Sequence, residues 1–449
     1  MNPKPTILIL EDNEAREAAL RHAIGEIGAD YVVKVWCDAH VMCAECEAFF
    51  PEAVLISLDH DLTPRPGANP DAGTGMDSAR FLSDHLPVCP VIVHSQNTEL
   101  VWSMYNEFRF AGWTVEQAGG MGTDWSEANW LRCADALLKE NRNTWKANLP
   151  ADHAMRVARM QLSLDGLGLG DALGEMLSYR SENAERRLMA NDVPAGPWFH
   201  TDDTEMAISI VAVLKSHGEL HQDALAKRFA RRFERDPDRG YGRMTRIQLR
   251  EINAGAKWRE MAANAFSGLG SMGNGGAMRV APLGAYFADD LTLCADAARA
   301  PSLVTHTHPE GVAGTIAVAV AAAMAWQLRG VPVAEYAPKF FSEILRYTPE
   351  SKVRRGLLLA SQTPGEVPFQ DVAKALGNGS LVTAPDTVPF CLWMAAHHPR
   401  NFVEALGKTI SAGGDCDTNA AIVGGIVALG AGRESIPAEW LKAREVIRA

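Results

Sequence analysis

The segment Trp198-Phe199-His200-Thr201-Asp202-Asp203-Thr204-Glu205 decides the fold of the larger part of this chain. It places two adjacent carboxylates between two threonine hydroxyls, directly before the apolar run Met206 to Leu214. This order predicts a helix that begins near Thr201, because Thr and Asp side chains accept the free N–H groups of a first turn. Capping alone needs only one acid. Two acids flanked by hydroxyls also form a set of hard oxygen ligands, which a hard divalent cation prefers.

A second segment has the same character. Gly413-Gly414-Asp415-Cys416-Asp417-Thr418-Asn419 precedes a run of small and apolar residues from Ala420 to Gly432. Asp415 and Asp417 are two residues apart on a glycine-led turn, so both carboxylates can face one side. Taken singly, each segment is equally consistent with a capped helix and solvated acids. Taken together, the two segments predict a centre for two divalent cations, Mg²⁺ or Mn²⁺.

The segment 155–449 contains five motifs in order: Gly166-Leu-Gly-Leu-Gly170-Asp171-Ala-Leu-Gly174, Thr201-Asp-Asp-Thr204, Gly273-Asn-Gly-Gly-Ala-Met-Arg279, His306-Thr-His-Pro-Glu-Gly311 and Gly413-Gly-Asp-Cys-Asp-Thr418. With these motifs the segment resembles the ADP-ribosylglycohydrolase family, the DraG-like hydrolases. The resemblance implies an all-helical domain over 153–449 that binds two divalent metal ions.

The resemblance also implies a reaction and residue roles. The reaction is cleavage of the glycosyl bond of an ADP-ribosylated protein or small molecule, with release of ADP-ribose. The implied metal ligands are Thr201, Asp202, Asp203, Asp415, Asp417 and Thr418. The implied catalytic residues are Asp203, Asp171, Glu175 and Asp415. The implied substrate contacts are Asn274, Gly275, Arg279 and His308, although His308 is equally consistent with a structural role.

The first motif departs from the family at one position. Many members carry a glutamate seven residues beyond the aspartate that corresponds to Asp171, and Ser178 stands there in this chain. Glu175, one helical turn earlier, is a candidate to replace it. The departure keeps a second hypothesis open, in which the domain is a catalytically silent ADP-ribose-binding or immunity protein.

Residues 1–145 follow a different pattern. Apolar strand candidates at 6–10, 31–36, 53–58, 88–94 and 113–116 alternate with helical stretches. Continuous apolar strands that alternate with helices predict a parallel sheet covered on both faces, a three-layer α/β fold of the flavodoxin or receiver type. Functional side chains of such sheets lie beyond the carboxyl ends of the strands.

The polar residues at those strand ends resemble a receiver domain, with Glu11 and Asp12 as the acidic pair and Asp59 at the phosphoacceptor position. No lysine follows the fifth strand, and the Asp59-His60-Asp61-Leu and His94-Ser95-Gln-Asn97 runs resemble the receiver-derived group proposed to process cyclic phosphates. The candidate residues are Asp12, Asp59, His60, Asp61, His94 and Ser95. Two alternatives stay open: a degenerate receiver that only contacts proteins, and a two-component regulator phosphorylated on Asp59.

Composition sets further limits. The chain has 449 residues and a formal net charge of −12, and residues 1–150 hold 22 Asp and Glu against 11 Lys and Arg. This balance does not favour nucleic acid as a partner, and scattered cysteines without a signal peptide predict a cytoplasmic protein. The apolar run 311–328 predicts a buried core helix and no membrane span. Residues 140–152 predict a linker, 63–75 a lid, and 434–449 one closing helix.

Overall fold

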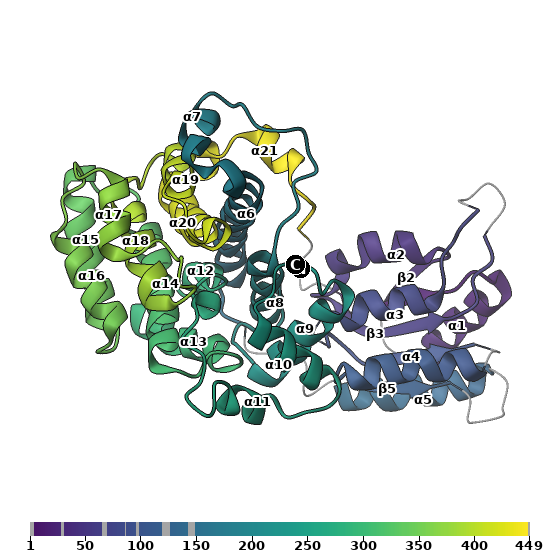
Figure 1. Ribbon diagram of the computed structural model, residues 1–449. Helices are drawn as coiled ribbons and strands as arrows, with labels where there is room; N and C mark the ends of the chain where they lie inside the picture. Colours follow the sequence, from purple (N-terminus) through teal and green to yellow (C-terminus); the bar gives the residue numbers. More distant parts are fainter. Residues whose placement is uncertain are drawn as a thin grey trace. The chain divides into compact units, whose positions relative to one another are not determined.

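The computed structural model describes residues 4–27, 31–64, 70–85, 87–95, 98–118, 126–141 and 149–447. By its contacts the chain divides into two compact units, Met1–Leu149 and Pro150–Ala449. The predicted linker lies mostly outside the described residues. Figure 1 shows an α/β unit in purple and blue and a helical unit in teal to yellow.

The smaller unit is a five-stranded, wholly parallel sheet in the order β2-β1-β3-β4-β5. This is the flavodoxin-like order, so the predicted fold class is confirmed. The strands are β1 Thr6–Leu10, β2 Val32–Trp36, β3 Ala53–Asp59, β4 Val91–His94 and β5 Val115–Gln117. The helical segments are α1 Glu14–Glu26, α2 Ala39–Glu45, η1 Cys46–Phe49, α3 Gly75–Ser83, α4 Thr98–Phe110 and α5 Glu127–Asn141.

Alternation along the strands builds two cores in this unit, because successive side chains point to opposite faces of a sheet. Leu8 and Leu10 of β1 pack in one core with side chains of α2, α3 and α4. Ile7 and Ile9 pack in the other core with side chains of α1 and α5. Both faces are therefore covered, and the polar residues at the strand ends are left at one edge.

The larger unit is helical throughout its named elements. Its first helices are α6 His153–Leu177, η2 Ser178–Asn183, α7 Ala184–Met189, α8 Asp202–His217, α9 Gln222–Arg235, α10 Arg243–Asn253, α11 Trp258–Asn264, η3 Asn274–Gly276, α12 Ala281–Tyr286 and α13 Leu291–Leu303. The remainder are α14 Pro309–Gln327, α15 Val333–Tyr347, α16 Lys352–Gln362, α17 Phe369–Leu376, α18 Ala384–His397, α19 Phe402–Ser411, α20 Cys416–Ala431, η4 Arg433–Ser435 and α21 Ala438–Ala443.

The pair α6 and α20 forms the centre of the larger unit. Gly166, Gly170 and Gly174 are spaced by four residues and therefore share one face of α6. A Cβ atom on Gly174 would lie 2.6 Å from Asp417 Cα, and one on Gly170 would overlap the backbone of Ala420. Because glycine has no Cβ atom, these positions let the two backbones approach more closely than any other residue would allow. This contact brings the carboxyl half of α6 against the entrance of α20.

The substitution Gly170→Ala is expected to destabilise this unit by about 3 kcal/mol, the upper part of the usual range for overpacking, because the added methyl group meets backbone that cannot move aside. Gly330→Ala is the matched control, since a Cβ atom there meets nothing within 4 Å. Its expected effect is below about 1 kcal/mol. Urea unfolding of both variants measures the difference, and equal stabilities would contradict the packing argument.

The apolar run was expected to be a core helix, and α14 is one. Among the described residues, α14 alone is long and apolar enough to cross a membrane, and 89% of its apolar window is buried in the unit. The expectation of one closing helix over 434–449 is wrong. Pro437 starts the short helix α21, and Arg444 then pairs with Trp198 in a parallel bridge.

Candidate functional site

The first acidic segment is anchored by Asp171, which is fully buried on α6. Its carboxylate accepts hydrogen bonds from Thr201 N at 3.0 Å, from Thr204 N at 3.0 Å and from Thr204 Oγ1 at 2.5 Å. Thr201 Oγ1 in turn donates to Asp203 Oδ2 at 3.0 Å. Asp171 therefore fixes the entrance of α8 and, through Thr201, the carboxylate of Asp203.

The second acidic segment is held from two loops. Asn274, in η3, donates to Asp415 Oδ2 at 2.7 Å and to Thr387 Oγ1 at 3.1 Å. The carbonyl of Asn378 accepts from Asp415 N at 3.1 Å and from Asn419 Nδ2 at 2.7 Å. Asn378 was missed by the sequence reasoning, although its setting in Gly377-Asn378-Gly379 is the signal of a tight loop.

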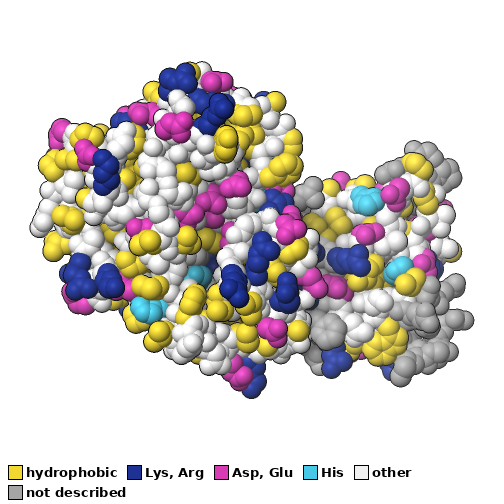
Figure 2. Space-filling view, in the orientation of Figure 1, with side chains coloured by type: hydrophobic (Ala, Val, Ile, Leu, Met, Phe, Trp, Pro, Cys, Tyr) yellow, Lys and Arg dark blue, Asp and Glu magenta, His cyan; other side chains and the backbone are white. Residues whose placement is uncertain are grey.

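The two segments act on one another electrostatically. Burial raises the pKa of Asp203 well above its usual value, and the neighbouring carboxylates Asp171, Asp417, Asp202 and Asp415 raise it further. Burial likewise raises the pKa of Asp171 to about 6 and that of Asp415 to about 7, with Asp417 adding to both. The acids of α6, α8 and α20 therefore lie together. Figure 2 shows acidic side chains gathered near the middle of the visible face of this unit.

Helix capping does not account for these acids. Thr201 and Asp415 occupy the N-cap positions of α8 and α20, yet neither side chain makes a capping hydrogen bond. The Oδ1 atom of Asp203 is buried without any hydrogen-bond partner. A buried, unpartnered carboxylate oxygen is costly unless a cation or proton satisfies it. The donor set of carboxylates and threonine hydroxyls therefore fits hard divalent cations.

Glu175 lies on the exposed side of this acid group. Burial of its carboxylate and the charge of Asp417 both raise its pKa. Ser178 is exposed, and its hydroxyl donates to the carbonyl of Glu175 at 2.8 Å at the end of α6. Cys416 is buried, and its thiol donates to Ile410 O at 3.6 Å. The end of α6 thus places Glu175 one turn before Ser178, in contact with it through the Glu175 carbonyl.

The four residues predicted to contact substrate differ in burial and in the groups that they contact. Arg279 is fully buried, and its guanidinium donates to Pro301 O at 2.8 Å and to Thr305 Oγ1 at 2.7 Å. These contacts favour a structural and electrostatic role, because burial keeps the guanidinium from a ligand. Asn274 positions Asp415. His308 caps α14, accepting from Glu310 N at 3.1 Å. Gly275 packs against the ring of His306.

The C-terminal segment supports the entrance of α8. Glu445 accepts two hydrogen bonds from Arg239, at 2.6 and 2.8 Å, and its amide donates to Trp198 O at 2.8 Å. Arg239 donates to His200 O at 2.9 Å, and its own carbonyl accepts from Asp202 N at 2.6 Å. A residue near the end of the chain thus holds the loop that carries Thr201 and Asp202. Sequence reasoning missed this role.

The substitution Glu445→Gln removes the charge that orients Arg239 while conserving size. For Mn²⁺ as the probe cation, we expect the dissociation constant in a calorimetric titration to rise about tenfold, the usual effect of losing a supporting contact of a metal site. The number of ions bound at saturation is expected to stay the same. The control is Glu439→Gln, which alters an exposed acid of α21. A Glu445→Gln protein with unchanged cation dependence would contradict the positioning role.

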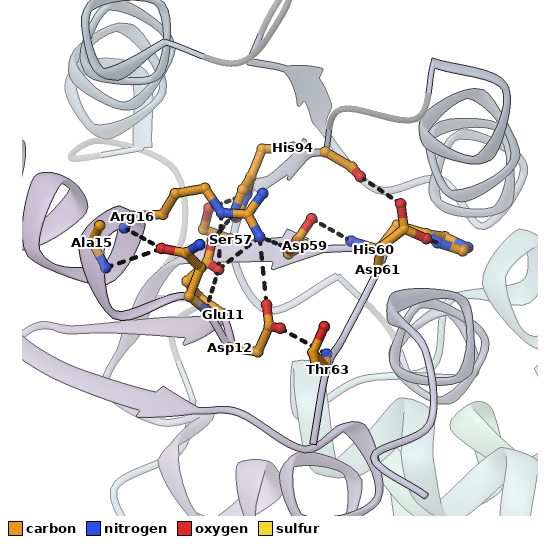
Figure 3. Close-up of polar contacts among 12 residues, drawn as sticks. Glu11, Asp12, Ala15, Arg16, Ser57, Asp59, His60, Asp61, Thr63 and His94 are labelled. Carbon is orange, nitrogen blue, oxygen red and sulfur yellow. Dashed lines mark hydrogen bonds and ion pairs between the residues drawn. The ribbon is translucent and has the colours of Figure 1, made fainter. Parts of the chain in front are cut away.

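The smaller unit brings its own predicted residues together at one sheet edge. One oxygen each from Glu11, Asp12 and Asp59 lies within 4.8 Å of the others. Arg16, which the sequence reasoning did not single out, contacts all three, as Figure 3 shows. Burial raises the pKa of Asp59 to about 6, with Glu11 adding to that effect and His94 and Arg16 opposing it.

The two histidines of this edge have different partners. Both ring nitrogens of the buried His94 are engaged, Nδ1 with Ser57 Oγ at 3.0 Å and Nε2 with Glu11 Oε2 at 3.2 Å. His60 Nδ1 lies 2.8 Å from Asp61 Oδ1, and Ser95 Oγ donates to Asp61 Oδ2 at 3.4 Å. Asn97 and the middle of the predicted lid, 65–69, lie outside the described residues.

The larger unit is an all-helical domain with buried carboxylates at the ends of its helices, and comparison with known proteins places it among the hydrolases. The chain belongs to the ADP-ribosylglycohydrolase family, whose model matches residues 152–448. The N-terminal residues 7–110 match the cyclic-phosphate processing receiver domain.

Named relatives agree with this family. The chain is 29% identical over 328 residues to ADP-ribosylhydrolase ARH3 of Xenopus tropicalis. The match covers 64% of this chain and 91% of the relative. The corresponding protein of Mus musculus is 28% identical over 338 residues, 65% of this chain and 89% of the relative. A solved structure titled "ADP-ribosylglycohydrolase-related protein complex" is 26% identical, with a TM-score of 0.48, and covers 65% of this chain and 94% of that one.

Proposed function

We propose that the larger unit is a divalent-cation-dependent hydrolase that releases ADP-ribose from an ADP-ribosylated protein or small molecule. The observation that carries the proposal is the buried, unpartnered Oδ1 of Asp203 amid four other carboxylates. Thr201, Asp202, Asp203, Asp415, Asp417 and Thr418 would hold two cations, Mg²⁺ or Mn²⁺. When bound, these cations would fix the ribose hydroxyls and polarise the bond that is cleaved.

The chain's own residues preorganise this centre. Asp171 holds the amides of Thr201 and Thr204, so the entrance of α8 does not need to rearrange when a ligand enters. Two residues hold Asp415: Asn274 donates to its carboxylate, and the carbonyl of Asn378 accepts from its backbone amide. Fixed ligands of this kind reduce the reorganisation that a reaction requires.

The reaction itself is a hydrolysis. The oxygen of water forms a bond to the anomeric carbon of the distal ribose, the bond to the acceptor breaks, and the acceptor leaves with a proton. Nearby carboxylates stabilise the positive charge that develops on the sugar ring. Glu175 is the acid placed to exchange a proton with solvent, because it is exposed and lies near Asp417.

The direct test is product analysis by mass spectrometry. The full chain is incubated with Mg²⁺ or Mn²⁺ and a panel of acceptors ADP-ribosylated on arginine, on serine or on a small molecule, with and without chelator. We expect ADP-ribose from at least one acceptor, and none with chelator. If no acceptor reacts while calorimetry detects tight ADP-ribose binding, the silent-binder hypothesis is correct. Chelator-resistant release would refute the cation dependence.

A second function is proposed for the smaller unit, namely opening of a cyclic phosphate on an ADP-ribose-type ligand. It is supported by the His60–Asp61 pair with Ser95 beside it, since a carboxylate fixes the tautomer of the ring and histidine suits proton transfer. The full chain is tested with an ADP-ribose cyclic phosphate. We expect His60→Ala to abolish ring opening but to spare ADP-ribose release; an inert wild-type chain would remove the proposal.

A further inference from the structure

The acidic cluster of the smaller unit, formed by Glu11, Asp12 and Asp59, contains a cation supplied by the chain itself. The Nη2 atom of Arg16 lies 2.5 Å from Asp59 Oδ2, 3.0 Å from Glu11 Oε1 and 3.4 Å from Asp12 Oδ1. Its Nε atom also donates to Glu11 Oε1 at 3.1 Å. We infer that Arg16 is the resident cation of this cluster and that the cluster takes no divalent cation.

Local structure explains why Arg16 reaches this position. Asn13 caps α1, and its side chain accepts from the amides of Ala15 and Arg16. Asn13 N donates to Glu11 Oε1 at 2.8 Å, so the turn between β1 and α1 is closed on the cluster. Arg16 lies four residues after Asp12, a spacing that puts the two side chains on the same side of the turn. The guanidinium is therefore directed at the strand ends.

The remaining carboxylate oxygens have partners of their own. Thr63 N donates to Asp12 Oδ2 at 2.7 Å, and His60 N donates to Asp59 Oδ1 at 2.8 Å. Glu11 Oε2 faces His94 Nε2 at 3.2 Å. Each of the three carboxylates therefore has one oxygen on Arg16 and its other oxygen on a separate partner (Figure 3). A divalent cation needs several oxygens directed at a single point about 2.0–2.6 Å away.

Entry of a divalent cation would require the guanidinium to leave. Bonds between a guanidinium and carboxylates are charge-assisted and strong, and Arg16 keeps its charge at all accessible pH values. Its departure would expose the buried carboxylates of Glu11 and Asp59 to one another, since both side chains have no exposed surface.

The test counts bound Mn²⁺ by electron paramagnetic resonance in the full chain and in variants. The larger unit contributes the same number of ions to each variant, so only differences between variants are interpreted. We expect Asp59→Asn to bind as many ions as the wild type, and Arg16→Met to bind one more. The double variant Arg16→Met/Asp59→Asn is expected to return to the wild-type number.

Arg16→Lys is the matched control, because it conserves the charge and is expected to bind no additional ion. Loss of one Mn²⁺ from Asp59→Asn alone would show that the wild-type cluster is open to cations and would overturn the inference. A folded Arg16→Met protein without an additional ion would also overturn it. If Arg16→Met does not fold, the comparison of wild type with Asp59→Asn still decides the question.

Discussion

Asp203→Asn is expected to reduce ADP-ribose release by about a hundredfold, which is the upper end of the loss seen when a supporting partner of a metal ligand is replaced. The substitution conserves shape and leaves an oxygen to accept from Thr201 Oγ1. It removes the charge of Asp203, the one acid in the described part of the chain with a buried, unpartnered side-chain oxygen. A neutral amide is a weaker ligand for a hard cation. Single-turnover assays across a range of Mn²⁺ concentrations measure the effect.

The control for this variant is Asp296→Asn, which alters an exposed acid of α13 and is expected to behave as the wild type. Calorimetric titration with Mn²⁺ separates the two contributions to the loss. We expect Asp203→Asn to bind fewer ions than the wild type. An Asp203→Asn protein that releases ADP-ribose at near wild-type rate with unchanged Mn²⁺ binding would show that the acid centre does not perform the reaction.

The second large effect concerns stability without cations. Asp415 has a pKa of about 7 in the fold, because of burial and the charge of Asp417, against about 3.9 in an unfolded chain. Between these two pKa values the folded chain keeps a proton on Asp415 that the unfolded chain has released. The stability that this protonated carboxyl contributes is therefore fully present below about pH 4 and is lost as pH rises towards 7. The chelator-treated protein is expected to become less stable, relative to Asp415→Asn, across that window.

Differential scanning calorimetry at pH 5 and pH 8 measures this effect. We expect the melting temperature of the chelator-treated wild type to fall by about 5 °C relative to Asp415→Asn. Added Mn²⁺ is expected to reverse the trend, because cation binding favours ionised carboxylates and stabilises the folded state. Because the two proteins share all other titratable residues, the difference between their melting temperatures removes the contribution of residues outside the centre. Parallel pH dependence in both proteins would contradict mutual repulsion in the acid group.

Much of the fold was readable because the patterns are local. Continuous apolar runs ending in polar residues located all five strands of the sheet, and their alternation with helices identified its parallel character. The first acidic segment likewise gave the start of α8 at Asp202. The tail was misread because its helical composition concealed the effect of Pro437 and the pairing of Arg444 with Trp198.

The supporting contacts of the centre could not be read in the same way. Asn378 and Glu445 lie far in sequence from the groups that they position, and no spacing rule relates such pairs. Arg16 was overlooked because an arginine in a first helical turn is ordinarily a solvated residue. Arg279 was assigned to the substrate from its motif, whereas its burial among α8, α9 and α13 depends on tertiary packing.

The bidentate contact between Glu445 and Arg239 has a practical consequence for handling the protein. A proteolytic cut between α21 and Glu445 would separate the two partners, and the loop that carries Thr201 and Asp202 would lose one of its anchors. The intact mass of each preparation is therefore a necessary control before its properties are compared with those of another preparation.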